Sequence, residues 1–331
     1  MLRIGLLGAG RIGQIHGRNI AAHPAAELAG IADALPTAAE ALAAETGAPV
    51  LAMEAVLEDR GIDAVVIAAP TDLHADLIEA AVHAGKAVFC EKPVDLDAGR
   101  IRECLEVVAA TGRPLMVGFN RRFDPSFAAL KARLEAGEVG AVEIVTILSR
   151  DPAPPPVPYI ERSGGLFRDM MIHDFDMARF LLDEEPVEVF ATASCLVDPA
   201  IGAAGDVDTA AVTLKTAGGR IVQISNSRRA TYGYDQRIEV HGQKGLLRAG
   251  NRHATTVEAA TAEGYRRDPA LDFFLERYRE AYQAELDAFV DGIGNGRPLT
   301  PSGEDGLRAQ VLADAASESW ETGAPVRLQA G

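Results

Sequence analysis

The sequence predicts an α/β fold: a doubly wound, mostly parallel sheet, then an α+β domain with an open, mostly antiparallel sheet. Over the first 120 residues or so, short β-rich runs alternate with helical stretches, as in right-handed βαβ units. Beyond that point, alternating apolar and polar runs are joined by glycine-rich turns, which is typical of antiparallel strands. We therefore divide the chain into residues 1–120 and 121–331, and leave open whether the C-terminal helices pack back on the first domain.

Apolar runs, glycines and prolines define the elements expected in the first domain. Residues 3–8 form a compact apolar run that ends at glycines, as a buried strand does. Residues 36–46 form a helical stretch with proline at its first turn, where a helix tolerates it. The expected strands are 3–8, 27–33, 63–70, 86–93 and 113–119, and the expected helices are 11–22, 36–46, 72–84 and 97–111.

The second half begins with a helix expected at 124–140, which ends in glycine, and a strand at 141–151. Prolines crowd residues 152–159, so this segment is expected to be a loop. A helix is then expected over 164–180. Antiparallel strands are expected within 210–227 and 236–250, and closing helices at 273–293 and 303–322.

The chain is acidic, with a formal net charge of −16 and a pI near 4.9. Because polyanions attract basic surfaces, we expect neither nucleic acid nor a membrane surface as a partner. No stretch approaches the ~18–20 apolar residues of a membrane span, and no signal peptide is evident. Cys90, Cys104 and Cys195 lie far apart, which indicates reduced thiols and predicts a cytoplasmic protein.

Residues 8–13 read Gly-Ala-Gly-Arg-Ile-Gly, directly after an expected strand and at the start of an expected helix. Gly8 permits the tight turn, Gly10 lets the backbone approach a pyrophosphate, and Gly13 allows close helix–strand packing. Asp33 ends the next expected strand, where a carboxylate binds ribose hydroxyls and repels a 2′-phosphate. The pattern predicts a Rossmann-type site for NAD rather than NADP; the alternative is a tight turn with a solvated aspartate.

Other expected strand ends carry further candidates. Lys92, in the run Cys-Glu-Lys-Pro, lies where ligands bind parallel sheets and is expected to reach the nicotinamide, although a surface lysine before a turn proline fits equally well. Pro70, Thr71 and His74 follow the preceding strand and either line the cofactor or form local turn structure.

Polar residues also follow the last strand of the first domain. Asn120, Arg121 and Arg122 leave the sheet toward the domain junction, where one of them binds substrate hydroxyls or the arginines form a salt bridge between domains. Tyr232 or Tyr234, beside the expected strand at 236–250, either donates a hydrogen bond to a polyol or is an ordinary strand aromatic.

The expected helix at 164–180 mixes acidic residues and a histidine with large apolar residues. Asp169, His173 and Asp176 are spaced i, i+4 and i+7, so they share one face of an α-helix. Burial of such groups without partners costs several kcal/mol. We interpret Asp169, His173 and Asp176 as a site for general acid–base chemistry. The alternatives are a structural polar network and a metal site, and we expect no metal.

Taken in order, these motifs resemble the glucose–fructose oxidoreductase/inositol dehydrogenase family over essentially the whole chain, and most closely its bacterial members that oxidise myo-inositol. They are GLLGAGRIG, CEKP, GFNRRFDP, GGLFRDMMIHDFDMARF and YGYDQRIEVHG. The resemblance implies NAD-dependent oxidation of myo-inositol to 2-keto-myo-inositol (scyllo-inosose) by a homotetramer built through the open sheet.

The resemblance also implies roles for individual residues. His173 takes the proton of the reacting hydroxyl, Lys92 holds and polarises its oxygen, and Asp169 supports both; these three are the candidate catalytic residues. The candidate cofactor contacts are Gly8, Gly10, Arg11, Ile12, Gly13, Asp33, Pro70, Thr71, His74, Glu91 and Lys92. The candidate substrate contacts are Lys92, Asn120, Arg122, Asp151, Asp169, His173, Asp176 and Tyr234.

One departure bears on the substrate. Some family members carry a His-x-Asn pair in the strand before the catalytic helix, whereas this chain has Ser149-Arg150-Asp151. Two alternatives therefore stand beside myo-inositol oxidation. The first is a related dehydrogenase of another polyol or sugar, such as scyllo-inositol, glucose or an amino-inositol. The second is a non-catalytic NAD(H)-binding sensor, which has no need of Lys92, Asp169 and His173 together.

Overall fold

The computed structural model describes residues 1–328. The chain divides into two compact units. Unit 1 comprises Met1–Phe123 and Ala281–Gln310, and unit 2 comprises Asp124–Glu280 and the residues from Val311 onward. The sequence indicated one boundary near residue 120, whereas in the structure the chain contributes a second segment to unit 1 after most of unit 2.

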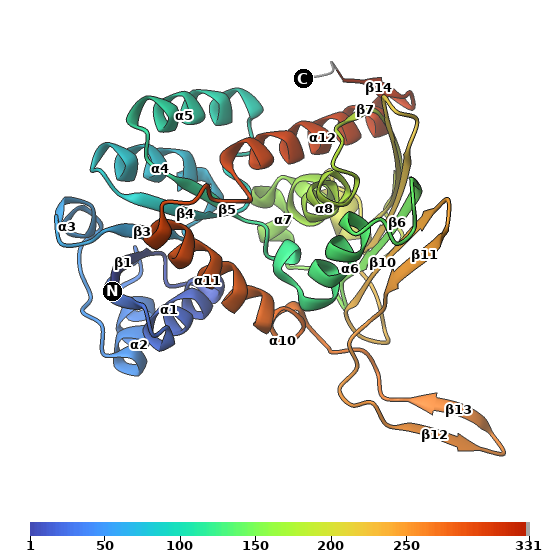
Figure 1. The fold of residues 1–331 in the computed structure, drawn as a ribbon, viewed down its shortest axis with the longest axis horizontal. Coiled ribbons are helices and arrows are strands. Elements are labelled where there is room, and N and C mark those ends of the chain that lie inside the picture. Colours follow the sequence, from blue (N-terminus) through green and yellow to red (C-terminus); the bar gives the residue numbers. More distant parts are fainter. Residues whose placement is uncertain (329–331) are drawn as a thin grey trace. The chain divides into compact units, whose positions relative to one another are not determined.

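Unit 1 is built on five parallel strands in the order β2-β1-β3-β4-β5. Helices cover both faces of this sheet (Figure 1). Its elements are β1 (Leu2–Leu7), α1 (Arg11–Ala22), β2 (Ala26–Ala32), α2 (Pro36–Thr46), α3 (Met53–Glu58), β3 (Ala64–Ile67), the 3-10 helix η1 (Thr71–Leu73), α4 (His74–His83), β4 (Ala87–Glu91), α5 (Ala98–Thr111), β5 (Leu115–Gly118), the 3-10 helix η2 (Asn120–Phe123), most of α11 (Arg279–Asn295) and the first part of α12 (Gly303–Thr322).

The chain leaves β1 to form β2 on one side and then crosses to form β3 on the other. Ligands of open α/β sheets bind at such a switch point, outside the carboxyl ends of the strands. The predicted fold class is confirmed in this unit, and α1 and α2 have the predicted bounds. The short helix α3 was not predicted, because six residues hold less than two turns of pattern.

Apolar residues from the sheet and from α11 form a continuous core in unit 1. Leu286, Phe289 and Val290 of α11 pack in the same cluster as Ile20 of α1 and Leu42 of α2. The second segment of unit 1 thus completes the core on the face that carries α1 and α2.

Unit 2 is built on a seven-stranded sheet in the order β11-β10-β6-β9-β8-β7-β14, which is antiparallel at every pair except β6 and β9. A separate hairpin, β12–β13, extends away from this sheet (Figure 1). Its elements are α6 (Pro125–Glu135), β6 (Val142–Arg150), α7 (Val157–Ser163), the π-helical turn η3 (Leu166–Met170), α8 (Ile172–Leu182), β7 (Pro186–Ser194), α9 (Pro199–Ala203), β8 (Thr209–Thr216), β9 (Ile221–Ser227), β10 (Asp235–Gly242), β11 (Gly245–Ala249), β12 (Glu258–Thr261), β13 (Gly264–Arg267), α10 (Phe274–Arg277) and β14 (Val326–Arg327), together with the end of α12.

Side chains on one face of this sheet are buried, and those on the other face are not covered by any part of the described chain. On β8, Ala210, Val212 and Leu214 are buried, and the residues between them are exposed. This alternation is the period-2 pattern from which the antiparallel strands were predicted. The predicted class of the second domain is confirmed.

Three local predictions in unit 2 need correction. The helix expected at 124–140 ends at Glu135, because Gly137 and Gly140 adopt positive φ. The loop expected at 152–159 stops at Pro156, and α7 begins at Val157 with proline in its first turn, where no N–H is needed. The helix expected over 164–180 is two elements, η3 and α8. No helix in the described part of the chain is long and apolar enough to cross a membrane.

Candidate active site

The glycine-rich loop between β1 and α1 has the geometry that its sequence predicted. Gly8 has φ +101°, and a Cβ there would lie 2.5 Å from the carbonyl of Ala68. A Cβ on Gly13 would lie 1.9 Å from the carbonyl oxygen of Gly8. A Cβ on Gly10 would meet nothing within 4 Å, so the open space beside Gly10 is available to a ligand. The tight turn at Gly8 and the close packing at Gly13 are thus as predicted, and the approach of a pyrophosphate at Gly10 stays a prediction.

The N-terminus of α1 and Asp33 fit the diphosphate and a ribose of NAD. No side chain caps α1, whose N-cap is Gly10, so its first N–H groups face the loop as an anion site requires. Asp33 lies directly after β2, where its Oδ2 accepts a hydrogen bond from Ala9 N at 2.5 Å and its Oδ1 accepts one from Leu35 N at 2.7 Å. The carboxylate is thereby fixed beside the loop and stays partly exposed.

His74 joins the ends of two strands. Its ring is 2% exposed; Nδ1 lies 2.7 Å from the carbonyl oxygen of Pro93, and Nε2 lies 2.8 Å from that of Ala69. Both ring nitrogens are thus used by the backbone. This geometry favours a positioning role over the direct cofactor contact expected of His74. Pro70 and Thr71, which start the same turn, remain at least partly exposed.

Lys92 follows β4 immediately and is partly exposed. Its neighbour Glu91 points into unit 1, where its Oε1 lies 2.7 Å from Nε2 of His16. Gly118 on β5 packs against the same carboxylate: a Cβ there would lie 3.0 Å from Glu91 Oε2. The backbone that carries Lys92 is therefore held from both sides, and the interaction with His16 was not foreseen from the sequence.

The residues after β5 are less exposed than expected. Asn120 and Arg121 are buried. Arg122 donates a hydrogen bond to Oδ1 of Asp305 at 2.9 Å, and both residues belong to unit 1. Arg122 thus forms a salt bridge, as one of the two alternatives predicted. Its partner, however, lies in the same unit and not in the other domain.

Asp169 and His173 lie on different elements of unit 2. Met171 N donates to Leu166 O at 2.9 Å, the i→i−5 bond of a π-helical turn, and α8 starts at Ile172. The expectation of one α-helical face for Asp169, His173 and Asp176 is therefore wrong, because the wider turn shifts the phase of the residues before it. Asp169 and His173 are partly exposed, and Asp176 is buried.

Tyr159 on α7 is a candidate that sequence reasoning missed. Its hydroxyl donates a hydrogen bond to Oδ1 of Asp169 at 3.0 Å, and its side chain is 50% exposed. The sequence predicted a proline-rich loop over residues 152–159. A tyrosine at the end of that segment, ten residues before Asp169, was the available signal.

Asp174 of α8 is fully buried. It accepts hydrogen bonds from Ser149 Oγ at 2.5 Å and Asn226 Nδ2 at 2.8 Å. These partners lie on β6 and β9, so Asp174 fastens α8 to the sheet. Asp176 is 1% exposed and lies 3.9 Å from a guanidinium nitrogen of Arg179. The alternative of a structural polar network was predicted for Asp169, His173 and Asp176, whereas the network seen here belongs to Asp174. The substrate contact expected of Asp176 stays a prediction.

The candidate substrate contacts on or beside the sheet of unit 2 differ in how far they are buried. Tyr234 is buried against Tyr278, with ring centroids 5.9 Å apart. Tyr232 is exposed and donates to Asp235 Oδ2 at 2.7 Å. The backbone N–H of Asp151 bonds Ser227 O at 3.0 Å, and its side chain is partly exposed.

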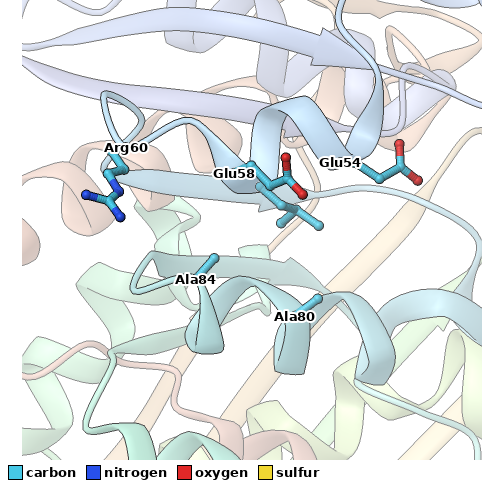
Figure 2. Close-up of a pocket in the computed structure, with 6 residues that line it drawn as sticks. Glu54, Glu58, Arg60, Ala80 and Ala84 are labelled. Carbon is cyan, nitrogen blue, oxygen red and sulfur yellow. The ribbon is translucent and has the colours of Figure 1, made fainter.

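A shallow surface hollow in unit 1 contains none of the predicted site residues (Figure 2). It is lined by Glu54, Leu57, Glu58, Arg60, Ala80 and Ala84. Arg60 precedes β3, and Ala84 follows α4. The hollow therefore lies toward the amino ends of the strands, opposite the edge at which the NAD candidates gather.

Two family models account for most of the chain. Residues 2–119 match the NAD-binding Rossmann fold of an oxidoreductase family, and residues 131–328 match the C-terminal alpha/beta domain of the same family. With the loop geometry above, these matches define a Rossmann-type, NAD-binding oxidoreductase. The chain belongs to the glucose–fructose oxidoreductase/inositol dehydrogenase family.

Several members of this family are closely similar to the chain. An inositol 2-dehydrogenase of Rhizobium meliloti (strain 1021) is 58% identical over 318 residues, which cover 96% of each chain. The structure of a myo-inositol dehydrogenase from Corynebacterium glutamicum ATCC 13032 matches with TM-score 0.96 and 48% identity over 100% of both chains. A scyllo-inositol dehydrogenase from Lactobacillus casei, with bound NAD(H) and scyllo-inositol, matches with TM-score 0.92 and 31% identity over 99% of both chains.

Proposed function

We propose that the protein oxidises myo-inositol to 2-keto-myo-inositol with NAD, as a step in myo-inositol catabolism. The observation that carries this proposal is the 58% identity to an inositol 2-dehydrogenase over 96% of both chains. The NAD-binding fold of unit 1 and the partly exposed Lys92, Asp169 and His173 support it.

The proposed reaction removes a hydride and a proton from one C–OH group. Bound NAD⁺ supplies the hydride acceptor. The loop from Gly8 to Gly13 and Asp33 hold the cofactor, and Lys92 donates a hydrogen bond to the reacting oxygen. His173 takes the hydroxyl proton as the C–O bond becomes a carbonyl, and Asp169 orients the substrate. The products are the ketone, NADH and a proton held on His173.

Replacement of Lys92 or His173 tests these roles. Lys92→Ala and His173→Ala should each lower kcat/KM by about 10²–10⁴-fold, because each removes a positioned proton donor or acceptor. Lys244→Ala in the turn between β10 and β11 and His83→Ala at the end of α4 are matched controls at exposed positions. Losses below about tenfold (~1.4 kcal/mol) would overturn the assignment.

A second inositol isomer is an alternative substrate. The Lactobacillus casei relative is a scyllo-inositol dehydrogenase, so scyllo-inositol is the second candidate substrate. NADH formation from myo-inositol, scyllo-inositol, chiro-inositol and glucose, with NAD and NADP, separates the two. The highest kcat/KM with myo-inositol and NAD supports the first candidate. NADH binding without turnover on any of these compounds would favour the sensor.

We also propose that the protein works as a cytoplasmic homotetramer. The open sheet face of unit 2 carries exposed apolar residues, among them Phe190 on β7, Ile221 on β9 and Leu246 on β11. Such a face gives two sheets an area on which to pack. Light scattering coupled to size exclusion measures the mass; four times the chain mass of 35.0 kDa is expected.

A further inference from the structure

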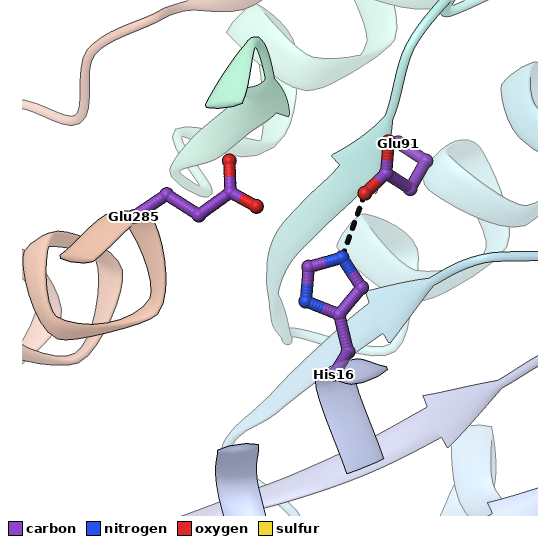
Figure 3. Close-up of side chains that lie close together, drawn as sticks. All are labelled: His16, Glu91 and Glu285. Carbon is purple, nitrogen blue, oxygen red and sulfur yellow. Dashed lines mark hydrogen bonds and ion pairs between the residues drawn. The ribbon is translucent and has the colours of Figure 1, made fainter. Parts of the chain in front are cut away.

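Three titratable side chains meet inside unit 1, behind the strand end that carries Lys92 (Figure 3). They are His16 from α1, Glu91 from the end of β4 and Glu285 from α11. One nitrogen or oxygen atom of each lies within 4.8 Å of the others. His16 and Glu285 are buried, and the side chain of Glu91 is 13% exposed.

The surroundings of this group are apolar. The His16 ring packs edge-on against Phe89 and Tyr282, with centroids 5.0 Å and 5.8 Å away. Neither carboxylate oxygen of Glu285 has a hydrogen-bond partner among the described residues. In Figure 3 the Glu285 side chain points toward Glu91 and His16. A charged carboxylate without a partner in such a site costs several kcal/mol, whereas a protonated carboxyl costs far less.

Two carboxyl groups this close in an apolar site do not both ionise near neutral pH. The titratable groups within reach of Glu285 are Glu91 and His16, and Tyr282, three residues earlier on the same helix, packs against the His16 ring. Burial raises the pKa of Glu285 well above its usual range, and the charge of Glu91 raises it further. Glu91 has His16 as a hydrogen-bond partner at 2.7 Å, whereas Glu285 has none among the described residues, so Glu285 is the carboxyl group better suited to hold a proton.

A bound metal explains this arrangement less well than a proton does. The 2.7 Å contact between Nε2 of His16 and Oε1 of Glu91 is a direct hydrogen bond. A metal bound between these two atoms would displace that proton and separate them, since cis ligands at the ~2.0–2.2 Å bond lengths of zinc lie about 3 Å apart or more.

We propose that Glu285 is a positioning residue: it holds a proton, so that Glu91 keeps its hydrogen bond to His16 and Lys92 sits next to one negative charge instead of two. The consequence for Lys92 rests on the proposed function. Ionised Glu285 would repel Glu91 from His16 and add a second negative charge near the lysine. Protonated Glu285 leaves the Glu91–His16 pair, and thus the backbone at Lys92, undisturbed.

The proton is tested without any activity assay. In D2O near neutral pD, the infrared difference spectrum between the wild type and Glu285→Gln should show the carbonyl band of a protonated carboxyl group. Glu106→Gln, an exposed position on α5, is the control that should show none. Absence of the band, or a stoichiometric metal ion in the purified protein that is lost in Glu285→Gln, would overturn the proposal.

The pH dependence of stability gives a second readout. A carboxyl pKa raised by folding means that the folded state binds the proton more tightly. The stability that Glu285 contributes is therefore fully present below the ordinary pKa of 4.5 and is lost as pH rises toward the raised pKa. The wild type should lose stability over this window, and Glu285→Gln should lose less of it. Identical slopes for the two proteins would contradict a raised pKa.

Positioning is tested by comparing a conservative variant with a truncation. Glu285→Gln copies the size and neutrality of the protonated group and should keep most of kcat. Glu285→Ala leaves a cavity beside Glu91 and His16 in which Glu91 can move, and should lower kcat about tenfold (~1.4 kcal/mol). Equal losses in both variants would show that ionised Glu285 is required. If the protein turns over no polyol, the proposed function fails separately. An NMR titration of isotopically methylated Lys92 then decides the positioning role, with a shift expected in Glu285→Ala and not in Glu285→Gln; no shift in either would overturn it.

Discussion

The hydroxyl of Tyr159 lies 3.0 Å from Oδ1 of Asp169, and this hydrogen bond links α7 to the π-helical turn η3. The tyrosine holds one oxygen of the carboxylate that we place beside the substrate. Because Tyr159 is half exposed, its removal should affect Asp169 more than the fold. Tyr159 is therefore a test of the site that leaves Lys92 and His173 intact.

Tyr159→Phe should lower kcat/KM by about twofold to just over tenfold, since one hydrogen bond of this kind contributes about 0.5–1.5 kcal/mol. Steady-state kinetics on the preferred polyol measure the effect, and Tyr265→Phe on the exposed hairpin strand β13 is the matched control. An unchanged kcat/KM in Tyr159→Phe would show that this contact does not orient Asp169 during turnover.

An added methyl group would lie in open space at Gly10 but would clash with the backbone at Gly13. Alanine substitutions at these two glycines therefore distinguish an effect on cofactor binding from an effect on folding. Gly10→Ala places the methyl in open space, so the variant should fold normally but bind NADH at least about tenfold more weakly, because the methyl enters the space of the pyrophosphate. Fluorescence titration with NADH measures the Kd.

Two other glycines serve as references for Gly10→Ala. Gly250→Ala also meets nothing within 4 Å and should leave the Kd unchanged. Gly13→Ala would clash at 1.9 Å with Gly8 O and should lower the melting temperature. Wild-type affinity in Gly10→Ala would mean that the diphosphate does not lie against this loop.

We propose that Asp33 determines the selectivity of the protein for NAD over NADP. Asp33→Ala removes the acceptor for ribose hydroxyls and the charge that repels a 2′-phosphate. The ratio of kcat/KM for NAD to that for NADP should fall tenfold or more, about 1.4 kcal/mol. Because Asp33 also accepts the N–H of Ala9, part of the loss with NAD comes from a looser loop. A ratio that stays at the wild-type value would place the selectivity elsewhere.

The nucleotide-binding half of the chain was predictable because its signals are local. The bounds of α1 and α2 follow from a glycine turn and from a proline at the first helical position. The fixed spacing of three glycines likewise determined the loop at Gly8–Gly13. Such signals depend on a few neighbouring residues, so they survive without knowledge of the packing.

The site in unit 2 was less predictable because it depends on a wide turn and on long-range partners. The i→i−5 hydrogen bond from Met171 N to Leu166 O changes which side chains share a face of the helix. No residue type in the sequence predicts such a bond. Which aspartate of this segment is buried in the sheet depends on Ser149 and Asn226, which lie 25 and 52 residues away from Asp174. Proline excluded a helix interior at 152–159 but not a helix start, so α7 and Tyr159 were missed.

Asp208 is a buried carboxylate of unit 2 that is not among the candidate site residues. Its oxygens accept backbone N–H bonds from Leu196 and Val197 at 2.8 Å and from Asp198 at 3.1 Å, and a hydroxyl bond from Thr209 at 3.0 Å. Burial by itself raises the pKa of this group, but the four hydrogen bonds outweigh it and lower the pKa from 3.8 to about 2. At about 1.4 kcal/mol per pH unit, the charged form contributes about 2 kcal/mol of stability.

Because the folded pKa of Asp208 is depressed, this stability is present above pH 3.8 and is lost as pH falls toward about 2. Asp208→Asn should therefore lower the free energy of unfolding by about 2 kcal/mol at pH 7, and its deficit relative to wild type should shrink in acid. Chemical denaturation at a series of pH values measures both effects, with the exposed Asp272→Asn as the control. A deficit that is the same at pH 7 and in acid would mean that the charge on Asp208 is not what holds the 195–208 loop.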